Sequence, residues 1–539
     1  MFANLPNYQG PHKVGFVDIE SNPDGNSPLR KGVLFRLYYP TSTTSAPKQN
    51  WLPEGWFYSK GYGNFLNIPT YLISTFIYPF LVYTKLAAFK ETPLETASLP
   101  TKLPVVIFSH GLAGMRTTYS NLCGNLASRG FIVAAIEHGD GSACATVRHA
   151  NDLEIPYHHP AKEEVLDGET ETEYALRFRR SQLTHRKNEV YTVLELLKRI
   201  DSGDDSFIYS KDESKKNTLL NQFQNRFDFD NKALVGHSFG GATSIHVLEA
   251  NEINFKCAVI LDPWMHAVNP EAEIHIPHMN LQSHVFHWKS NLDAVQRLVE
   301  RSKKAETKVA YIKDTKHNDA SDFGLLYPKI MSMAKQCGSN PVEAHKIQDS
   351  LIYGFIQKYL QVPVKIQEVA HERVVFDETA FDDLYNKPMN SFFHYRKAKK
   401  LEIISKFNIT KSHEISRKAA ELWKSESASV KEYFKEISMN EHSAFKQRHP
   451  NYDWQPWKTR SKKSRIDSYL LSPQSTSESE YVVSHFLHPT LLQSSPNFIH
   501  SGFVSQDVYD ATLLDSDIKG TIIWYDQGHF NLASKPNDL

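Results

Sequence analysis

The chain of 539 residues contains few cysteines, and they are not clustered. The four cysteines lie far apart, at Cys123, Cys144, Cys257 and Cys337. They form no Cys-x-x-Cys pair and no spacing typical of metal ligands, which argues against a disulfide scaffold and a zinc-finger type of site. We therefore expect reduced thiols in an intracellular protein, with no metal and no cofactor.

A secretory signal is also absent from the sequence. Residues 1–20 lack the basic region followed by an apolar run that such a signal requires. We therefore expect a protein that is not secreted and that resides in the nucleus, the cytoplasm or both.

Residues 65–84 form an uncharged stretch long enough to cross a membrane, but they suit that role poorly. The stretch contains Pro69, Pro79 and many Tyr, Thr and Ser residues. A membrane span and a plain core helix both remain open. The composition favours a third interpretation, an aromatic segment that lies on a membrane surface or beneath a lipid-binding mouth.

The formal charge of the whole chain is zero, yet the charge is unevenly distributed. Residues 386–465 hold 19 Lys and Arg against 8 Asp and Glu, a net charge of +11. The rest of the chain therefore carries −11. This asymmetry indicates a module for nucleic acid or another anionic surface, joined to an acidic or neutral part.

Apolar strands alternate with helices in the first part of the chain, which predicts a mostly parallel α/β sheet. The expected strands are 33–40, 104–112 and 131–138. The expected helices are 119–129 and 174–200, while 150–172 is expected to be irregular and 201–230 to be a polar connector.

The strongest local motif is Gly-x-Ser-x-Gly at 236–240, which follows an apolar run and precedes a helical pattern. This order of strand, tight turn and helix is typical of the nucleophile elbow of an α/β-hydrolase. The motif presents Ser238 as a candidate nucleophile. The backbone N–H of Phe239 and that of Leu112, the last residue of the 104–112 stretch, are the candidate oxyanion donors.

A catalytic triad in this fold needs an acid and then a histidine after the serine. Asp262 ends the apolar strand 258–262, and His317 follows the strand 308–313. In this interpretation His317 is the general base and Asp262 orients it. Asp314, Asp319 and Asp322 are alternative partners for His317, and the alternative histidines are His110, His138 and His237.

These motifs together resemble the platelet-activating factor acetylhydrolase family over residues 10–362. The resemblance rests on the sequences at 34–40, 108–112, 236–243 and 261–265, and on His317 followed by Asp322 and Phe323. It implies an α/β-hydrolase fold and a calcium-independent esterase of the phospholipase A2 type. Such enzymes dock on lipid surfaces and cleave short or oxidised sn-2 acyl chains, with Ser238, Asp262 and His317 as the triad.

The basic segment from 386 to 465 reads as three helices, beginning near Lys387, Ser412 and Ser427. Its expected aromatic core is Phe392, Trp423 and Phe434. The segment resembles an HMG box of the sequence-preferring, mating-type kind, which binds the DNA minor groove and bends the duplex. The resemblance implies Phe393 as the apolar wedge and two groups of polar contacts: Asn390 and Ser412 to base edges, and Lys387, Arg396, Lys397 and Arg417 to phosphates.

The sequence therefore predicts four regions: a hydrolase domain (1–362), a linker (363–385), an HMG box (386–465) and a partly disordered tail (466–539). Two hypotheses about function follow. In the first, the chain is a phospholipid esterase joined to a DNA-binding module. In the second, it is primarily a DNA-binding or architectural protein whose hydrolase domain serves as a scaffold.

Overall fold

The computed structural model describes residues 4–23, 32–161, 164–286, 289–366, 371–376, 389–409 and 412–448. The chain divides into two compact units at Tyr385 and Asn386.

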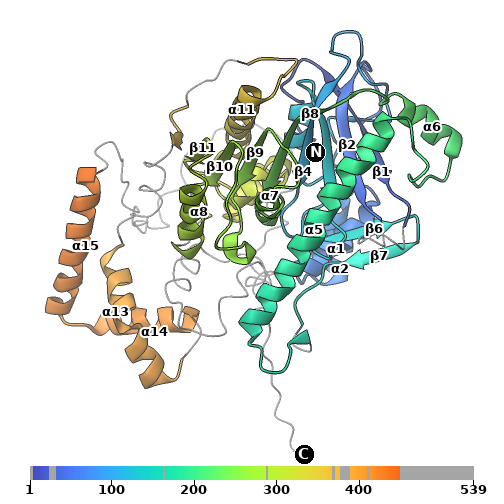
Figure 1. The fold of residues 1–539 in the computed structure, drawn as a ribbon. Coiled ribbons are helices and arrows are strands. Elements are labelled where there is room, and N and C mark those ends of the chain that lie inside the picture. The colour runs from blue at the N-terminus through green and yellow to red at the C-terminus, as the bar shows by residue number, and fades with distance from the viewer. Residues whose placement is uncertain are drawn as a thin grey trace, which may run out of the picture. The chain divides into compact units, whose positions relative to one another are not determined.

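The first unit is built on a ten-stranded sheet with the order β12-β11-β10-β9-β8-β4-β5-β2-β1-β3 (Figure 1). A separate two-stranded sheet joins β6 and β7. The strands are β1 Lys13–Glu20, β2 Leu34–Thr41, β3 Phe89–Lys90, β4 Leu103–Ser109, β5 Ile132–Glu137, β6 Ala145–Arg148, β7 Leu153–Pro156, β8 Phe227–His237, β9 Cys257–Leu261, β10 His278–Ser283, β11 Thr307–Ile312 and β12 Val374–Phe376.

The middle of this sheet is parallel, and its two sides contain antiparallel pairs. Strands β5, β4, β8, β9, β10 and β11 pair in parallel with their neighbours. Antiparallel pairing joins β1 to β2, β2 to β5 and β11 to β12. The predicted α/β-hydrolase class with a mostly parallel sheet is therefore confirmed.

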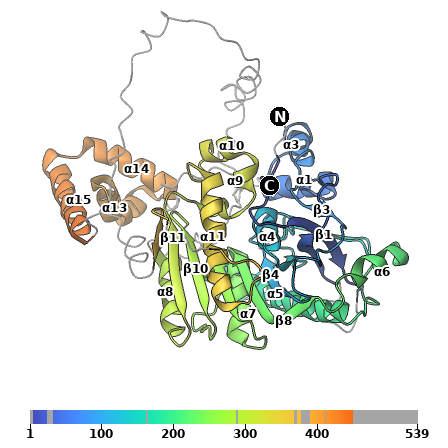
Figure 2. The ribbon, with the colours of Figure 1, turned by 90° about the horizontal axis from the view of Figure 1, so that it is seen from above.

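Helices cover both faces of the sheet, and the alternation of side chains along each strand determines which face they reach. In β4, Val106 and Phe108 pack into the core that includes residues of α4 and α11, whereas Val105 and Ile107 pack into the core that includes residues of α5 and α7. Figure 2 shows these two layers from above.

The helices of the first unit include one long helix, α5. The uncharged stretch at 65–84 contains only short helical segments. The helices are α1 Gly55–Phe65, α2 Thr70–Leu72, a π-helical turn Ile73–Ile77, α3 Tyr78–Val82, α4 Ser120–Ala127, α5 Glu171–Asp201, α6 Glu213–Asn221, α7 Phe239–Ala250, α8 Lys289–Arg301, α9 Phe323–Leu326, α10 Pro328–Met333 and α11 Pro341–Tyr359. Short 3-10 helices span Met265–Ala267 and His317–Ala320.

Three segments differ from the sequence-based expectation. The connector 201–230 contains α6, whose N-cap Asp212 accepts a hydrogen bond from the Lys215 N–H. The stretch 150–172 contains β7, which pairs with β6. The expected linker contains β12, which extends the sheet by pairing with β11. Helix α6 and strands β7 and β12 are each too short or too polar to show a clear apolar repeat, so the sequence pattern predicts them only weakly.

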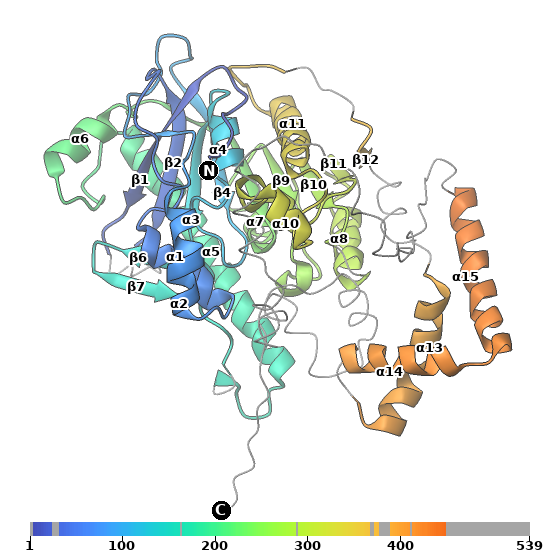
Figure 3. The ribbon, with the colours of Figure 1, turned by 180° about the vertical axis from the view of Figure 1, so that it is seen from behind.

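Helices α1 to α3 gather beside the β6–β7 hairpin (Figure 3). Gly61 of α1 lies against this hairpin, where a Cβ atom would come within 2.8 Å of the Ala145 Cβ. In the part of the chain that the structure describes, no helix has both the length and the apolar character needed to cross a membrane.

The second unit is a bundle of three helices, α13 Ser391–Phe407, α14 Ser412–Ser425 and α15 Ala428–Arg448. The Asn390 side chain caps α13 by accepting from the Phe393 N–H at 3.0 Å. The ring of Trp423 packs against Phe392 and Phe434, as expected, and lies closest to Tyr395, with ring centroids 4.8 Å apart. Tyr395 is fully buried and was not anticipated from the sequence.

Candidate functional site

The candidate nucleophile lies in the turn between β8 and α7. Ser238 adopts φ 59° and ψ −119°, a conformation that a residue other than glycine rarely takes. The flanking glycines make the turn possible. A Cβ on Gly236 would come within 2.1 Å of the Gly240 carbonyl oxygen, and one on Gly240 within 2.0 Å of the Ser109 carbonyl oxygen.

Asp262 and His317 meet at the same edge of the sheet, although 55 residues separate them. Asp262 follows β9, and His317 opens the 3-10 helix that comes after β11. The Asp262 Oδ2 lies 3.2 Å from the His317 Nδ1. The Ser283 N–H at the end of β10 donates to the Asp262 Oδ1 at 2.6 Å, which fixes the carboxylate.

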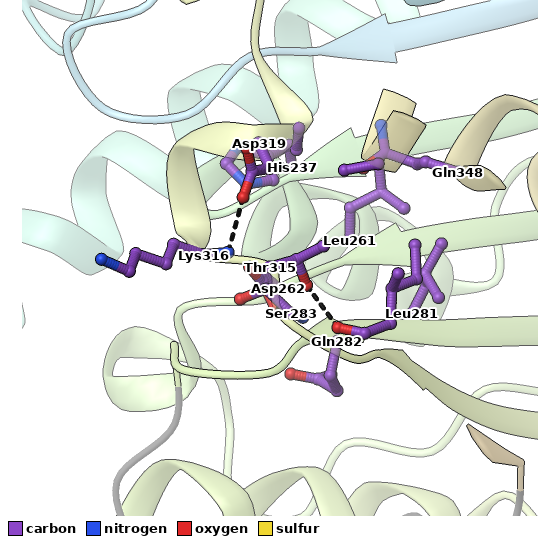
Figure 4. Close-up of a pocket in the computed structure, with 13 residues that line it drawn as sticks. His237, Leu261, Asp262, Leu281, Gln282, Ser283, Thr315, Lys316, Asp319 and Gln348 are labelled. Carbon is purple, nitrogen blue, oxygen red and sulfur yellow. Dashed lines mark hydrogen bonds between the residues drawn. The ribbon is translucent and has the colours of Figure 1, made fainter. Parts of the chain in front are cut away.

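The three alternative carboxylates have other partners. Asp319 accepts hydrogen bonds from the N–H groups of Lys316 and Gly338 at 2.8 and 2.7 Å, and Figure 4 shows the first of these. Asp314 pairs with the Ser339 hydroxyl. Asp322 accepts from the N-terminus of α4. Among these four carboxylates, the one hydrogen-bonded to His317 is that of Asp262.

Burial controls the protonation of this acid–base pair. It raises the pKa of Asp262 to about 6 and lowers the pKa of His317 to about 3. At neutral pH the carboxylate is therefore charged and the imidazole is neutral, which is the state in which a histidine accepts a proton. The His317 ring lies between aromatic neighbours, 3.5 Å from the Phe286 centroid and 4.4 Å from the His237 centroid.

The loop after β4 packs directly against the serine. A Cβ on Gly111 would lie 3.0 Å from the Ser238 Cβ. The backbone N–H groups of Leu112 and Phe239 have no hydrogen-bond acceptor among the described residues. Arg186 of α5 anchors the loop by donating to the His110 carbonyl at 2.7 Å.

The other histidines near the elbow take part in buried networks. The His138 Nδ1 lies 2.5 Å from Glu189, and its Nε2 lies 2.8 Å from the Ser109 hydroxyl. His110 contacts the Gly111 carbonyl and the His138 N–H. His237 pairs with the Tyr119 hydroxyl. These contacts give each ring a structural partner, so none of the three competes with His317 for Asp262.

One group of side chains within the described residues has the spacing of a metal site. Single ligand atoms of His237, Asp262 and His317 all lie within 4.8 Å of one another. Within this group Asp262 and His317 are hydrogen-bonded to each other, and the His237 Nδ1 lies 2.7 Å from the Tyr119 hydroxyl oxygen. The expectation of no metal therefore remains a prediction.

Several residues that shape this site were not singled out from the sequence. Tyr119 and Arg186 hold the loop after β4, and Ser283 holds Asp262. Asp322 was expected as an alternative partner of His317 and as part of a motif, not as the acceptor for the N-terminus of α4. Tyr119 and Arg186 lie on or next to helices, where a polar residue normally signals a solvent-exposed face, so nothing local in the sequence marks them.

The predicted DNA contacts differ in their surroundings. Lys387 lies outside the described residues, as does the side chain of Ser412. Lys397 and Arg417 are exposed on α13 and α14, and Phe393 is half-buried beside Phe392. The side-chain oxygen of Asn390 accepts the capping bond of α13.

Arg396 differs from the other predicted phosphate contacts because it is buried. Its side chain is 5% exposed, and the Nε donates to the Ser416 hydroxyl at 2.9 Å. The hydrogen bond links α13 to α14. Arg396 therefore stabilises the interior of the box in this structure, and its contact with phosphate remains a prediction.

Curated relatives match both parts of the chain. A platelet-activating factor acetylhydrolase from Gallus gallus is 29% identical over 375 residues, covering 66% of this chain and 84% of the relative. The enzyme of the same name from Cavia porcellus is 30% identical over 371 residues, covering 66% and 78%. The transcription factor ste11 of Schizosaccharomyces pombe is 33% identical over 114 residues, which are 20% of this chain and 23% of that protein.

A solved structure titled a ferulic acid esterase from Streptomyces cinnamoneus superimposes with a TM-score of 0.48 and 15% identity, covering 70% of this chain and 99% of that chain. Two family models also match the chain. Residues 2–374 match platelet-activating factor acetylhydrolase, isoform II, and residues 385–453 match the HMG (high mobility group) box. The chain therefore belongs to the platelet-activating factor acetylhydrolase isoform II family and also carries an HMG box.

Proposed function

We propose that the hydrolase domain is a serine carboxylic ester hydrolase whose triad is Ser238, Asp262 and His317. The observation that carries the proposal is the 3.2 Å contact between His317 and Asp262 at the sheet edge that holds the strained Ser238 turn. Ser238 attacks the acyl carbon while His317 accepts its proton, and His317 then returns a proton to the leaving alcohol. Asp262 stabilises the imidazolium that forms between these steps.

The backbone N–H groups of Leu112 and Phe239 are the proposed oxyanion donors. Phe239 is the first residue of α7, where the helix dipole favours negative charge. Leu112 follows Gly111, which packs on Ser238. Two such donors that are already in place stabilise a tetrahedral intermediate, and the loss of one costs about 10²- to 10³-fold in kcat.

The proposed substrates are phospholipids with a short or oxidised sn-2 acyl chain, cleaved without calcium. The names of the relatives support this class, since they include a platelet-activating factor acetylhydrolase and a putative phospholipase A2 from Schizosaccharomyces pombe. The α1–α3 segment suits a lipid surface, because it exposes Trp56 and Tyr71, and Tyr83 follows it. Tyr62 of the same segment contacts Thr118 near the Leu112 loop at 2.9 Å.

The test is the Ser238→Ala variant of the full-length protein, assayed on nitrophenyl acetate and on a short-chain phospholipid in the presence of a calcium chelator. Turnover should fall by at least about 10³-fold. Ser244→Ala is a matched control, because Ser244 is another buried serine of α7. Unchanged turnover in Ser238→Ala would refute the assignment of the nucleophile.

We further propose that the HMG box binds the DNA minor groove and bends the duplex, with Phe393 as the wedge. The exposed Lys397 and Arg417 and the positive charge of the segment support electrostatic binding to phosphates. Access to the nucleus is part of this proposal, with the cytoplasm as a second location. A purely architectural role, with the hydrolase domain as a scaffold, is the competing function.

The DNA proposal is tested by binding of the full-length protein to four-way or bent DNA over a series of salt concentrations. The logarithm of the affinity should fall linearly with the logarithm of the salt concentration. Phe393→Ala should weaken binding and reduce bending, while Tyr433→Ala removes an aromatic side chain that is 60% exposed on α15 and should change neither. Affinity independent of salt would contradict binding led by phosphate contacts.

A further inference from the structure

His237, the residue before the candidate nucleophile, is connected to three parts of the site. Its side chain is 2% exposed. The Nδ1 lies 2.7 Å from the Tyr119 hydroxyl oxygen, and the ring centroid lies 4.4 Å from that of His317. The Nε2 is buried and has no hydrogen-bond partner among the described residues, and His237 lines a cavity of about 10 Å³ together with Asp319 and Gln348 (Figure 4).

Tyr119 connects His237 to the loop that carries the proposed oxyanion donor Leu112. The Gly111 N–H donates to the Tyr119 hydroxyl oxygen at 3.3 Å. Because this oxygen already accepts from an N–H, its own proton is available to be donated to the His237 Nδ1. When the hydroxyl donates in this way, the ring proton of His237 lies on Nε2.

We propose that the Tyr119–His237 pair positions the candidate triad. In this proposal His237 is a neutral ring, protonated on Nε2, that packs beside His317 and holds it in place. Tyr119 fixes the tautomer of His237. The inference rests on the proposed serine mechanism and extends it to two residues that do not touch the reacting atoms. The pair joins the elbow, the loop after β4 and the segment that carries His317.

Charge explains why a neutral ring is needed at this position. During the proposed reaction His317 becomes positively charged, and a second cation with its ring centroid 4.4 Å away would oppose that step. Burial, together with the nearby His317, holds the pKa of His237 well below its usual range. His237 therefore remains neutral while the adjacent His317 gains and loses its proton.

The test compares two tyrosine-to-phenylalanine variants of the full-length protein. Tyr119→Phe removes the hydroxyl that bonds His237. Tyr38→Phe is the matched control, because Tyr38 is also fully buried in the same core and its hydroxyl has no hydrogen-bond partner among the described residues. On nitrophenyl acetate, Tyr119→Phe should lower kcat by about tenfold to a hundredfold with little change in KM, while Tyr38→Phe keeps both values.

A second readout does not depend on activity. In protein labelled with ¹⁵N-histidine, the His237 signals, assigned by their loss in His237→Gln, should report a neutral Nε2–H tautomer from pH 5 to 8. The Tyr119→Phe variant should show a mixture of tautomers. A His237 that titrates in this range or carries its proton on Nδ1, or a fully active Tyr119→Phe enzyme, would overturn the proposal.

The two readouts separate this proposal from the serine mechanism. If the wild-type protein hydrolyses no ester while His237 still shows the tautomer fixed by Tyr119, the proposed function fails and the structural relation between the two residues holds. If the wild-type enzyme is active and depends on Ser238 but Tyr119→Phe behaves like Tyr38→Phe, the positioning role fails and the proposed function stands.

Discussion

Asp262 and His317 are both buried, and their shared environment shifts their pKa values in opposite directions. Burial raises the pKa of Asp262 from 3.8 to about 6 and lowers the pKa of His317 from 6.5 to about 3. The pair thus holds a charged carboxylate and a neutral imidazole across the whole neutral range. The ascending limb of a pH–rate profile should therefore report Asp262 rather than His317.

We predict that kcat/KM for a nitrophenyl ester falls as the pH is lowered through about 6. Asp262 takes up a proton there, because burial raises its pKa, and the protonated acid no longer stabilises the imidazolium. Below that point the rate should fall about tenfold for each pH unit. The measurement is the pH dependence of initial rates, with intrinsic fluorescence as a check that the protein stays folded.

The Asp262→Asn variant is the control for this profile. This variant should lose most of the activity. The pH profile of its residual activity should show no inflection near pH 6. A wild-type profile that stays level down to pH 5 would contradict the assignment of the limb to Asp262.

At the residue scale, the sequence predicted Ser238, Asp262 and His317 as the site residues. In the structure these three residues lie at one edge of the sheet. Local order along the chain was sufficient, because each residue follows an apolar strand and parallel strands end at a common edge. Tyr119, Arg186 and Ser283 could not be anticipated in the same way. Their roles depend on contacts across the fold with residues distant in sequence.

Among the structural elements, α4 depends on a carboxylate supplied from a distant part of the chain. Asp322 accepts from the N–H groups of Ser120 and Asn121 at 3.0 Å each, and from the Trp51 indole N–H at 2.9 Å. The first two donors belong to the buried first turn of α4, where backbone N–H groups have no acceptor within the helix. One side chain thus joins α4, the loop before α1 and the segment after His317.

We predict that Asp322→Ala destabilises the hydrolase domain by about 3 kcal/mol or more, because it leaves several buried donors without an acceptor. Asp212→Ala is the matched control. Asp212 also caps a helix, α6, but it is exposed and accepts one backbone hydrogen bond, so its loss should cost about 1 kcal/mol. Urea unfolding of both variants gives the comparison, and equal losses would refute the special role of Asp322.

The elements themselves were predictable to the extent that their apolar patterns were long. Strands β2, β4, β5, β9 and β11 and helices α4, α5, α13, α14 and α15 lie where the periodicity placed them. Helix α6 and strand β12 were missed. The first is polar on most positions, and the second has three residues, so its place in the sheet depends on pairing with β11 rather than on its own pattern.

For the whole molecule, the sequence already separated a basic helical part, residues 386–465, from a first part in which strands and helices alternate. The charge asymmetry and the change from strand-rich to helical patterns carried that inference. The interior of the HMG box was less predictable. Tyr395 and Arg396 are buried there. The resemblance to an HMG box implied Arg396 as a phosphate contact, which requires an accessible side chain.

The proposed function depends most directly on Ser238 being the nucleophile of an ester hydrolase. The full-length protein is treated with a fluorophosphonate, and mass spectrometry identifies the modified residue. The rate of hydrolysis of a short-chain phospholipid is measured in the same samples. We expect one adduct, on Ser238, that forms at the same rate as activity is lost. The adduct should form more slowly when substrate is present. Activity that persists while Ser238 is fully modified, or that disappears with an adduct on a different residue, would contradict it.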